Sequence, residues 1–265
     1  VLEHMGARVL DEHPYRIGRG ADTPVLWLHD IGLQMAPDTD FSAIRLRFEA
    51  LFAQTWKGEV ESDDLNRLLL STTLGAREIT VLRAYTRYFK QLGLPFGQGY
   101  IEAALNHNAP IAEEICALFA ARFDPSFQGD RDQERANRRA RIESLLGDVQ
   151  SLDDDRILRQ FYASVVATLR TNAWQTTADG RFKPYLSFKF DPRQLPGVPE
   201  PKPLFEIWVC SPRVEGVHMR GGKVARGGLR WSDRREDFRT EILGLVKAQQ
   251  VKNTVIVPVG SKGGF

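Results

Sequence analysis

The sequence has little cysteine, few histidines and no long apolar run, and each shortage excludes a class of protein. Its two cysteines, Cys116 and Cys210, lie far apart, so neither a disulfide framework nor a cysteine zinc site is expected. The five histidines form no HxH or HxxxH pattern, and we expect no metal. No stretch approaches the ~20 apolar residues of a membrane-spanning helix, and no secretion signal is recognisable. We therefore expect a cytoplasmic protein without a membrane partner.

The 265 residues are 42% apolar and 26% charged, a composition typical of a folded protein with a packed core. The net charge of +2 is unevenly distributed, because the segment from Arg213 to Phe265 holds eleven Lys or Arg against five Asp or Glu. A cationic end predicts an anionic partner: a carboxylate, a phosphate or a nucleic acid. The charged segment Asp130–Arg141 is only mildly basic, which favours a solvated helix face over RNA binding. We expect no nucleic acid.

The first 172 residues predict a small hairpin followed by helices. Two strand-like runs, 7–17 and 25–30, flank a turn at 18–22 and predict one β-hairpin, which needs further packing. Asp40 is an expected N-cap, and the apolar spacing after it predicts a helix to Trp56. Similar spacing and punctuation predict further helices near 65–75, 79–93, 98–105, 110–124 and 152–169. Their aromatic residues favour bundle packing over a cofactor site.

The remaining residues change in character after Asn172. The runs 184–192 and 204–212 (PYLSFKFDP and LFEIWVCSP) predict strands separated by a proline-rich loop. From His218 the order is strand, helix, strand and glycine turn: a capping box of Asp233 and Glu236, a helix from Phe238 to about Lys252, a buried strand at 254–259, and the turn 260–264. The fold expected is α+β: a hairpin at 1–36, a mostly α region at 37–172, and the start of an α/β domain at 173–265.

The turn Gly260–Gly264, with sequence GSKGG, carries the clearest chemical signal. Ligands of open α/β sheets bind at the carboxyl ends of strands, and glycines let the backbone approach a ligand closely. If Lys262 is buried beside cations such as Lys252 and Arg226, its pKa falls and it becomes a candidate general base. Because Gly263 follows Lys262, a phosphate-binding P-loop lacks its hydroxyl. A lysine in a solvated turn is the alternative that the bare pattern leaves open.

The order ARGGLRW, helix, lysine, TVIVPV and PVGSKGG resembles the substrate domain of the glutamate, leucine, phenylalanine and valine dehydrogenases. The wider segment EGVHMRGGKVARGGLRWSDRREDFRTE resembles the large, multidomain bacterial NAD-dependent glutamate dehydrogenases. Upstream, RVLDEHPYRI, LWLHDIG, LRAYTRYFKQLG and DDDRILRQF are similar to segments that precede the catalytic domain of that family. The hairpin then resembles the remnant of an ACT-like domain.

The resemblance implies roles for individual residues. Lys262 corresponds to the catalytic lysine that helps to activate water and transfer protons, and Lys252 to a lysine that holds a substrate carboxylate. Arg226 stands where the shorter enzymes have lysine, and these two residues are not interchangeable; Lys223 is the alternative for that position. The resemblance also places Gly227, Gly228 and Gly263 among the substrate-binding positions.

The implied reaction is the reversible oxidative deamination of L-glutamate to 2-oxoglutarate and ammonia, with hydride passing to NAD. No G-x-G-x-x-G motif occurs, so we expect NAD to be bound by a domain outside this chain, and the acidic catalytic partner to lie beyond Phe265. We expect an internal fragment of a homo-oligomeric enzyme, inactive alone. An amino-acid-sensing or oligomerisation module without catalysis is the alternative. Allosteric effectors, the oligomeric state and the choice of NAD over NADP stay open.

Overall fold

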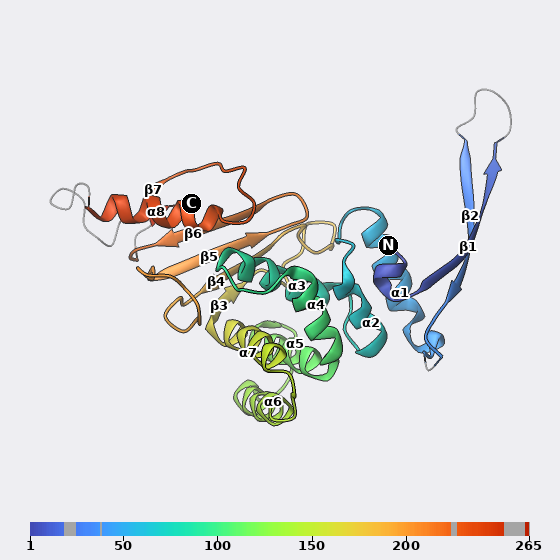
Figure 1. Cartoon of the computed structure of the whole chain (residues 1–265), viewed down its shortest axis with the longest axis horizontal. Helices are drawn as coiled ribbons and strands as arrows, with labels where there is room; N and C mark the ends of the chain where they lie inside the picture. Colours follow the sequence, from blue (N-terminus) through green and yellow to red (C-terminus); the bar gives the residue numbers. More distant parts are fainter. Residues whose placement is uncertain (19–24, 38, 224–226, 252–262, 265) are drawn as a thin grey trace.

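The computed structural model of the protein describes residues 1–18, 25–37, 39–223, 227–251 and 263–264. It shows a hairpin, a group of helices and a six-stranded sheet (Figure 1). The elements are, in chain order, η1 (Glu3–Met5), β1 (Arg8–Ile17), β2 (Leu26–Gln34), α1 (Phe41–Trp56), η2 (Asp64–Arg67), α2 (Leu68–Ser71), α3 (Ala76–Gln91), α4 (Gln98–His107), α5 (Ala109–Phe123), α6 (Arg131–Leu146), α7 (Leu152–Ala167), β3 (Thr168–Thr171), β4 (Leu186–Phe190), β5 (Phe205–Cys210), β6 (Glu215–Arg220), β7 (Gly227–Gly228), α8 (Phe238–Val251) and β8 (Gly263–Gly264).

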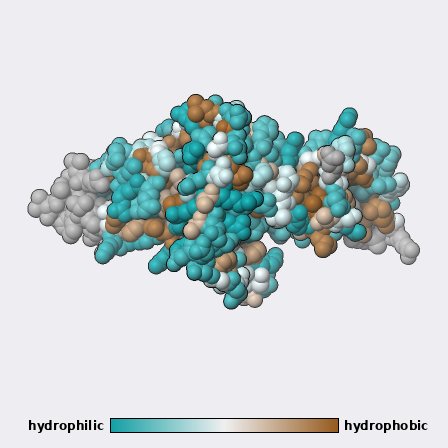
Figure 2. All heavy atoms as spheres, turned by 90° about the horizontal axis from the view of Figure 1, so that it is seen from below, coloured by the Kyte–Doolittle hydropathy of each residue, from teal (hydrophilic) through white to brown (hydrophobic). Residues whose placement is uncertain are grey.

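The predicted hairpin is confirmed, with a second strand that is longer than expected. β1 and β2 are antiparallel, and Ile17 lies opposite Leu26 while Tyr15 lies opposite Leu28. These four apolar side chains share one face, and each is at least half exposed. Figure 1 shows the hairpin standing apart from the other elements, and Figure 2 shows hydrophobic side chains at this end of the molecule. Most of the predicted turn lies outside the described residues.

The predicted cap of the first long helix is also confirmed. The carboxylate of Asp40 accepts hydrogen bonds from the backbone N–H groups of Ser42 and Ala43, at 3.0 and 3.4 Å, and α1 begins at Phe41. Such a side chain satisfies donors that the first helical turn leaves without a partner. The signal is local, so the sequence alone was sufficient to find it.

The aromatic residues of the helices form the core, as their spacing predicts. Tyr85, Tyr88 and Phe89 of α3 are completely buried. The ring of Phe89 lies 4.8 Å from that of Phe161 in α7, and the ring of Tyr88 lies 4.7 Å from that of Phe190 in β4. Helices and sheet therefore share one hydrophobic core, which contains buried side chains from Met5 to Val246.

The helix predicted over 152–169 is too long. α7 ends at Ala167, and Thr168–Thr171 forms β3, which pairs with β4. The Thr168 hydroxyl donates to the carbonyl of Ser164 at 2.7 Å and lies 2.7 Å from the Tyr85 hydroxyl. The apolar spacing continues past the end of α7, but pairing with a distant strand decides the conformation there.

The six-stranded sheet has the order β3-β4-β5-β6-β8-β7. All of its neighbouring strands are antiparallel except β7 and β8. One face buries the cross-strand row Phe188, Trp208 and Val217, and helices α3 and α8 pack there: the Trp208 ring lies 5.5 Å from that of Tyr88 and 6.0 Å from that of Phe238. The row Lys189, Ile207 and His218 lies on the opposite face, where its side chains are half-buried.

Helix α8 is confirmed, but its predicted capping box is wrong. α8 begins at Phe238, five residues after Asp233, and the carboxylate of Glu236 instead pairs with Lys90 at 2.7 Å. The side chain of Gln91, in α3, occupies the capping role, because its Oε1 accepts from the backbone N–H of Arg239 at 3.1 Å. A cap supplied by a residue so distant in sequence leaves no local pattern. The predicted strand 254–259 lies outside the described residues.

A buried ion pair joins α8 to β5 and α3. The guanidinium of Arg239 donates two hydrogen bonds to the carboxylate of Glu206, both of 2.7 Å, and the two side chains are only 1% and 0% exposed. The Tyr88 hydroxyl donates to the same carboxylate at 2.9 Å. Burial, together with the Glu206 carboxylate, holds the pKa of Tyr88 well above its usual value, so this phenol keeps the proton that it donates.

We predict that Glu206→Ala lowers the free energy of unfolding by about 3–5 kcal/mol, because it leaves the Arg239 charge buried without its partner. Chemical denaturation of the chain measures this change. Replacing both residues by methionine should cost much less, since no charge is then left in the core. Asp179→Ala, in the exposed pair with Arg181, is the control and should change the free energy of unfolding little, because an exposed ion pair is screened by solvent. An equally small loss for Glu206→Ala would contradict the prediction.

His218 makes the stability depend on pH. Burial, and then the nearby Arg220, lower the pKa of His218 below its usual value. The unfolded chain therefore binds this proton more readily than the folded chain, and the free energy of unfolding rises with pH in this interval. The contribution is complete above about pH 6.5, the unperturbed value, and is lost as the pH falls through the folded pKa.

Acidification from pH 8 to pH 5 should therefore destabilise the wild type more than His218→Gln. These two values lie roughly one and a half units on either side of the unperturbed histidine pKa. Denaturant unfolding at both pH values measures the difference. His107→Gln, which changes an exposed histidine of α4, serves as the control. Equal acid sensitivity of the wild type and His218→Gln would refute the assignment.

Candidate functional site

Two glycine segments that are far apart in sequence lie side by side in the sheet. β7 is parallel to β8, and Gly227 pairs with Gly263 while Gly228 pairs with Gly264. On its other side β8 is antiparallel to the end of β6, where Arg220 pairs with Gly263. The structure therefore brings together Gly227, Gly228 and Gly263, the three predicted substrate-binding glycines, at one edge of the sheet.

Glycine at position 264 lets α8 lie directly against the strand. A Cβ atom on Gly264 would stand 3.2 Å from Cγ2 of Val246 and 3.5 Å from Cγ2 of Ile242, both on α8. The first distance is tighter than ordinary van der Waals contact, so a side chain at Gly264 would require Val246 to shift by a few tenths of an ångström. The glycine pairs thus form a stretch of backbone surface without side chains, and α8 packs against its β8 strand.

The three predicted cationic site residues, Lys262, Lys252 and Arg226, lie outside the described residues. Each is bonded in sequence to a described element: Lys262 precedes Gly263, Arg226 precedes Gly227, and Lys252 follows the end of α8. Lys223, the alternative for the first position, is exposed just after β6, and its carbonyl accepts a hydrogen bond from the guanidinium of Arg220.

Arg220 is a feature of this site that the sequence analysis missed. It is the register partner of Gly263, and its buried Nε atom has no hydrogen-bond partner among the described residues. A signal is present in the sequence, because RGG occurs twice in the segment HMRGGKVARGG. Arg220 belongs to the first copy, whereas the resemblance concerns the second.

The sheet face around Arg220 is strongly positive. Burial, then Arg170, then Arg220 lower the pKa of Lys189, and Arg220 also contributes to the lowered pKa of His218. The ammonium of Lys189 lies 3.7 Å from the centre of the Phe205 ring, a favourable cation–π contact. A region in which guanidinium groups add to the burial that lowers the pKa of Lys189 and of His218 favours the approach of an anion such as a carboxylate.

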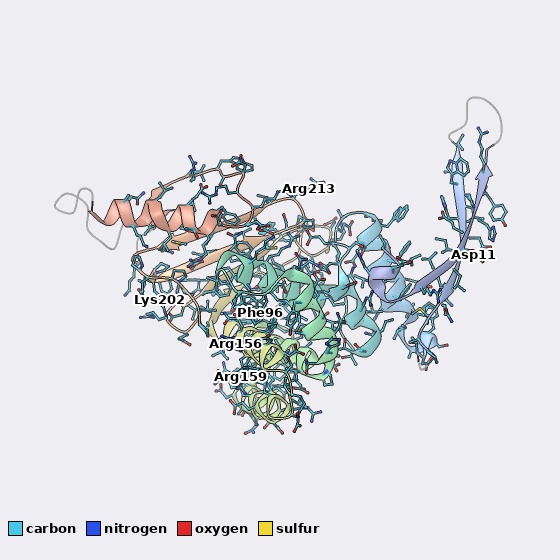
Figure 3. All side chains as sticks on the ribbon, viewed as in Figure 1. Asp11, Phe96, Arg156, Arg159, Lys202 and Arg213 are labelled. Atoms are coloured by element: carbon cyan, nitrogen blue, oxygen red, sulfur yellow. The ribbon has the colours of Figure 1, made fainter. Side chains whose placement is uncertain are left out.

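A groove of about 890 Å³ runs along the first half of β6. Its walls come from α3, the β5–β6 turn and the segment 229–238, and it is large enough for a small organic ligand. Arg87 lies in it, held by the carboxylates of Glu61 and Glu215. Figure 3 shows Lys202 and Arg213 near opposite ends of β5, with Arg213 on the groove side. The groove reaches toward the glycine pairs, because its lining includes Leu229, which directly follows β7, and Ile242 of α8.

The groups in this region are not those of a metal or thiol site. Within the described ranges, no three His, Cys, Asp or Glu side chains are arranged to hold a metal ion. Cys116 and Cys210 are buried free thiols, and burial raises the pKa of Cys210 to about 12, which leaves its thiol protonated and unreactive. No helix in the described part of the chain has the length and hydrophobicity to cross a bilayer.

Comparison with known families extends this picture over most of the chain. The family model for the bacterial NAD-glutamate dehydrogenase catalytic domain matches residues 141–265. That for glutamate dehydrogenase helical motif 3 matches residues 60–125, and that for the glutamate dehydrogenase ACT3 domain matches residues 1–45. The first range contains both glycine segments, and the last contains the hairpin.

Three curated relatives, each called NAD-specific glutamate dehydrogenase, align with the whole chain. The protein of Halomonas elongata is 50% identical and that of Pseudomonas aeruginosa 49% identical, while that of Mycobacterium tuberculosis is 44% identical. The chain covers 16%, 17% and 17% of their respective lengths, about a sixth of each. Together with the three family models, these alignments show that the chain belongs to the family of the bacterial NAD-glutamate dehydrogenases.

Proposed function

We propose that the protein containing this chain catalyses the NAD-dependent oxidative deamination of L-glutamate to 2-oxoglutarate and ammonia, and the reverse reaction. The observation that carries the proposal is the pairing of Gly227 and Gly228 with Gly263 and Gly264. It joins the two motifs that resemble the substrate site of amino-acid dehydrogenases, within a segment that matches the family's catalytic domain. The comparisons favour this function over a sensing or oligomerisation module without catalysis.

Lys262 is proposed as the catalytic residue. It directly precedes the glycine pair of β8, and a cation beside its amine would favour the neutral form, since a nearby cation disfavours a second charge. In its neutral form the amine accepts a proton from the water that adds to the carbon of the protonated imine, and it passes this proton to the nitrogen of the resulting carbinolamine. As that nitrogen leaves as ammonia, the amine accepts the hydroxyl proton and releases it to solvent, and the reverse reaction uses the same transfers in the opposite order.

The substrate carboxylates need cations and backbone donors. Lys252 and Arg226 are proposed to hold them, because both are adjacent in sequence to elements of the glycine edge, and an arginine can bind a carboxylate through two hydrogen bonds. Gly227, Gly228 and Gly263 are proposed to let the substrate reach the backbone. L-Glutamate and 2-oxoglutarate are dianionic at their carboxylates, which suits the net +6 of the segment 213–265.

The residues of this chain do not fit a dinucleotide. The sequence has no G-x-G-x-x-G motif, and the glycines described at the sheet edge pair with other strands instead of leading from a strand into a helix. We therefore propose that NAD binds to another part of the whole protein, which also supplies the acidic catalytic partner. The chemistry assigned to this chain is substrate binding and proton transfer.

The organisation of the chain is proposed as the hairpin 1–36, the helical region 37–172 and the start of the substrate domain 173–265. The end of β2 at Gln34 and the change from helices to strands after α7 support these boundaries. Homo-oligomeric assembly and a cytoplasmic location are proposed for the whole protein. The buried free thiols are compatible with a reducing compartment.

We predict that the 265-residue chain alone forms no NADH from L-glutamate, whereas the whole protein does. The reason is that hydride transfer needs the dinucleotide-binding part, which the chain does not provide. The absorbance of NADH, followed with glutamate and NAD in excess, measures both rates. NADH formation by the chain alone would show that its residues bind the dinucleotide, and would overturn the proposal that NAD binds to another part of the whole protein.

In the whole protein, Lys262→Ala should lower kcat by a factor of about 10²–10⁴, the range in which a positioned general acid or base contributes. Steady-state kinetics measure the loss, and circular dichroism shows whether the fold is retained. Lys57→Ala removes an exposed lysine at the end of α1 and is the matched control. A folded Lys262→Ala variant with wild-type kcat would remove Lys262 from the mechanism.

A further inference from the structure

The first turn of α8 depends on a side chain from α3. Gln91 is buried, with 4% of its surface exposed. Its Oε1 accepts from the backbone N–H of Arg239 at 3.1 Å, and its Nε2 donates to the backbone carbonyl of Arg235 at 2.6 Å. Arg239 is the second residue of α8, so its N–H is one of the donors that a helix cannot satisfy internally. Gln91 thus takes the place of an N-cap side chain.

The acidic residues ahead of α8 have other contacts. Glu236 pairs with Lys90, and the carboxylate of Asp237, which directly precedes the helix, pairs with the guanidinium of Arg234. The carbonyl of Asp237 accepts from Thr240 N–H at 2.9 Å. Within the described contacts, Gln91 is therefore the side chain that satisfies the N–H of Arg239, and its removal leaves that buried donor without a partner.

The position of α8 determines the position of the glycine edge. Val246 and Ile242 of α8 pack closely against Gly264, with side-chain methyl groups 3.2 and 3.5 Å from the place of a Cβ atom on this glycine, and β8 in turn pairs with β7. Because the contact is close, a shift of the helix toward the strand would displace the strand that it supports. A series of contacts therefore links Gln91 to α8, α8 to Gly264 of β8, and β8 to Gly227 and Gly228 of β7.

We propose that Gln91 is a positioning residue for substrate binding: by capping α8 from α3, it holds the paired glycine strands in the arrangement that accepts the dicarboxylate. The inference rests on the function proposed above and gives the helical region a part in it. Without the cap, α8 takes several positions, and the substrate binds to only one of them. The apparent affinity for substrate then falls in proportion to the fraction of molecules in that position. Saturating substrate restores that arrangement, so kcat is preserved.

The test is the kinetics of Gln91→Met in the whole protein, because methionine keeps the volume and removes both hydrogen bonds. We expect KM for L-glutamate to rise roughly fivefold, the ratio that corresponds to the loss of one helix cap, with kcat close to that of the wild type. Gln91→Glu retains the acceptor for Arg239 N–H and should recover most of the affinity. Hydrogen exchange of the segment 238–243 should accelerate in Gln91→Met and less in Gln91→Glu.

Gln160→Met is the matched control. Gln160 is a glutamine of α7 with 6% exposure, and its Nε2 donates to the carbonyl of Pro196 at 3.2 Å, remote from α8. A rise in KM confined to the Gln91 variants supports the proposal. Unchanged KM in Gln91→Met, or equal changes in Gln91→Met and Gln160→Met, would overturn it.

If Gln91→Met does not fold, the test uses folded Gln91→Glu. A raised KM together with a wild-type rate of hydrogen exchange in that variant would overturn the proposal as well. A wild-type protein without glutamate turnover would refute the proposed function instead.

Discussion

The buried carboxylate of Glu206 is the constraint on which the arrangement of α3, β5 and α8 depends. Taking two ions out of water costs several kcal/mol each unless their hydrogen bonds are replaced, and here Arg239 and Tyr88 replace them. The partners come from three elements that are widely separated in sequence. A large displacement of one element leaves a charge or a phenol in the core without its partner, so these contacts limit how far the three elements can move relative to one another.

This constraint explains why the helical region and the sheet share one core. Trp208, at the centre of the sheet, packs between Tyr88 of α3 and Phe238 of α8, and its indole N–H donates to the carbonyl of Ala84 at 3.0 Å. Near the surface, Arg87 of α3 is held between Glu61 and Glu215. The segment that matches helical motif 3 therefore forms part of the packing of the catalytic segment, with contacts both in the core and at the groove.

The features that could be predicted from the sequence are those with local signals. The hairpin, the Asp40 cap and most helix positions follow from turn residues, a capping side chain and apolar spacing, all within a few residues. β3 could not be predicted, because Leu169 continues the apolar spacing of α7 and the segment becomes a strand only by pairing with β4. The cap of α8 could not be predicted either, since Asp233 and Glu236 have the spacing of a capping box while Gln91 has none.

The candidate site likewise has some features that could be predicted from the sequence and others that could not. The motifs that contain Gly227, Gly228 and Gly263 could be recognised by resemblance, but their parallel pairing needed the structure. Arg220 had no assigned role in the resemblance, and its importance follows only from its register with Gly263. When the function of a residue depends on a neighbour across the sheet, the spacing of residues along the chain does not predict it.

The hairpin has a consequence for how this segment behaves when its surroundings are absent. A two-stranded ribbon presents rows of unsatisfied backbone groups along its outer edges, and such edges act as templates for strand addition between molecules. β1 contains Pro14, which lacks a backbone N–H, while β2 contains no proline. Intermolecular association of the segment should therefore start at β2, where Trp27 and Leu28 are more than half exposed, and a proline introduced at an outward-facing N–H of β2 would suppress it.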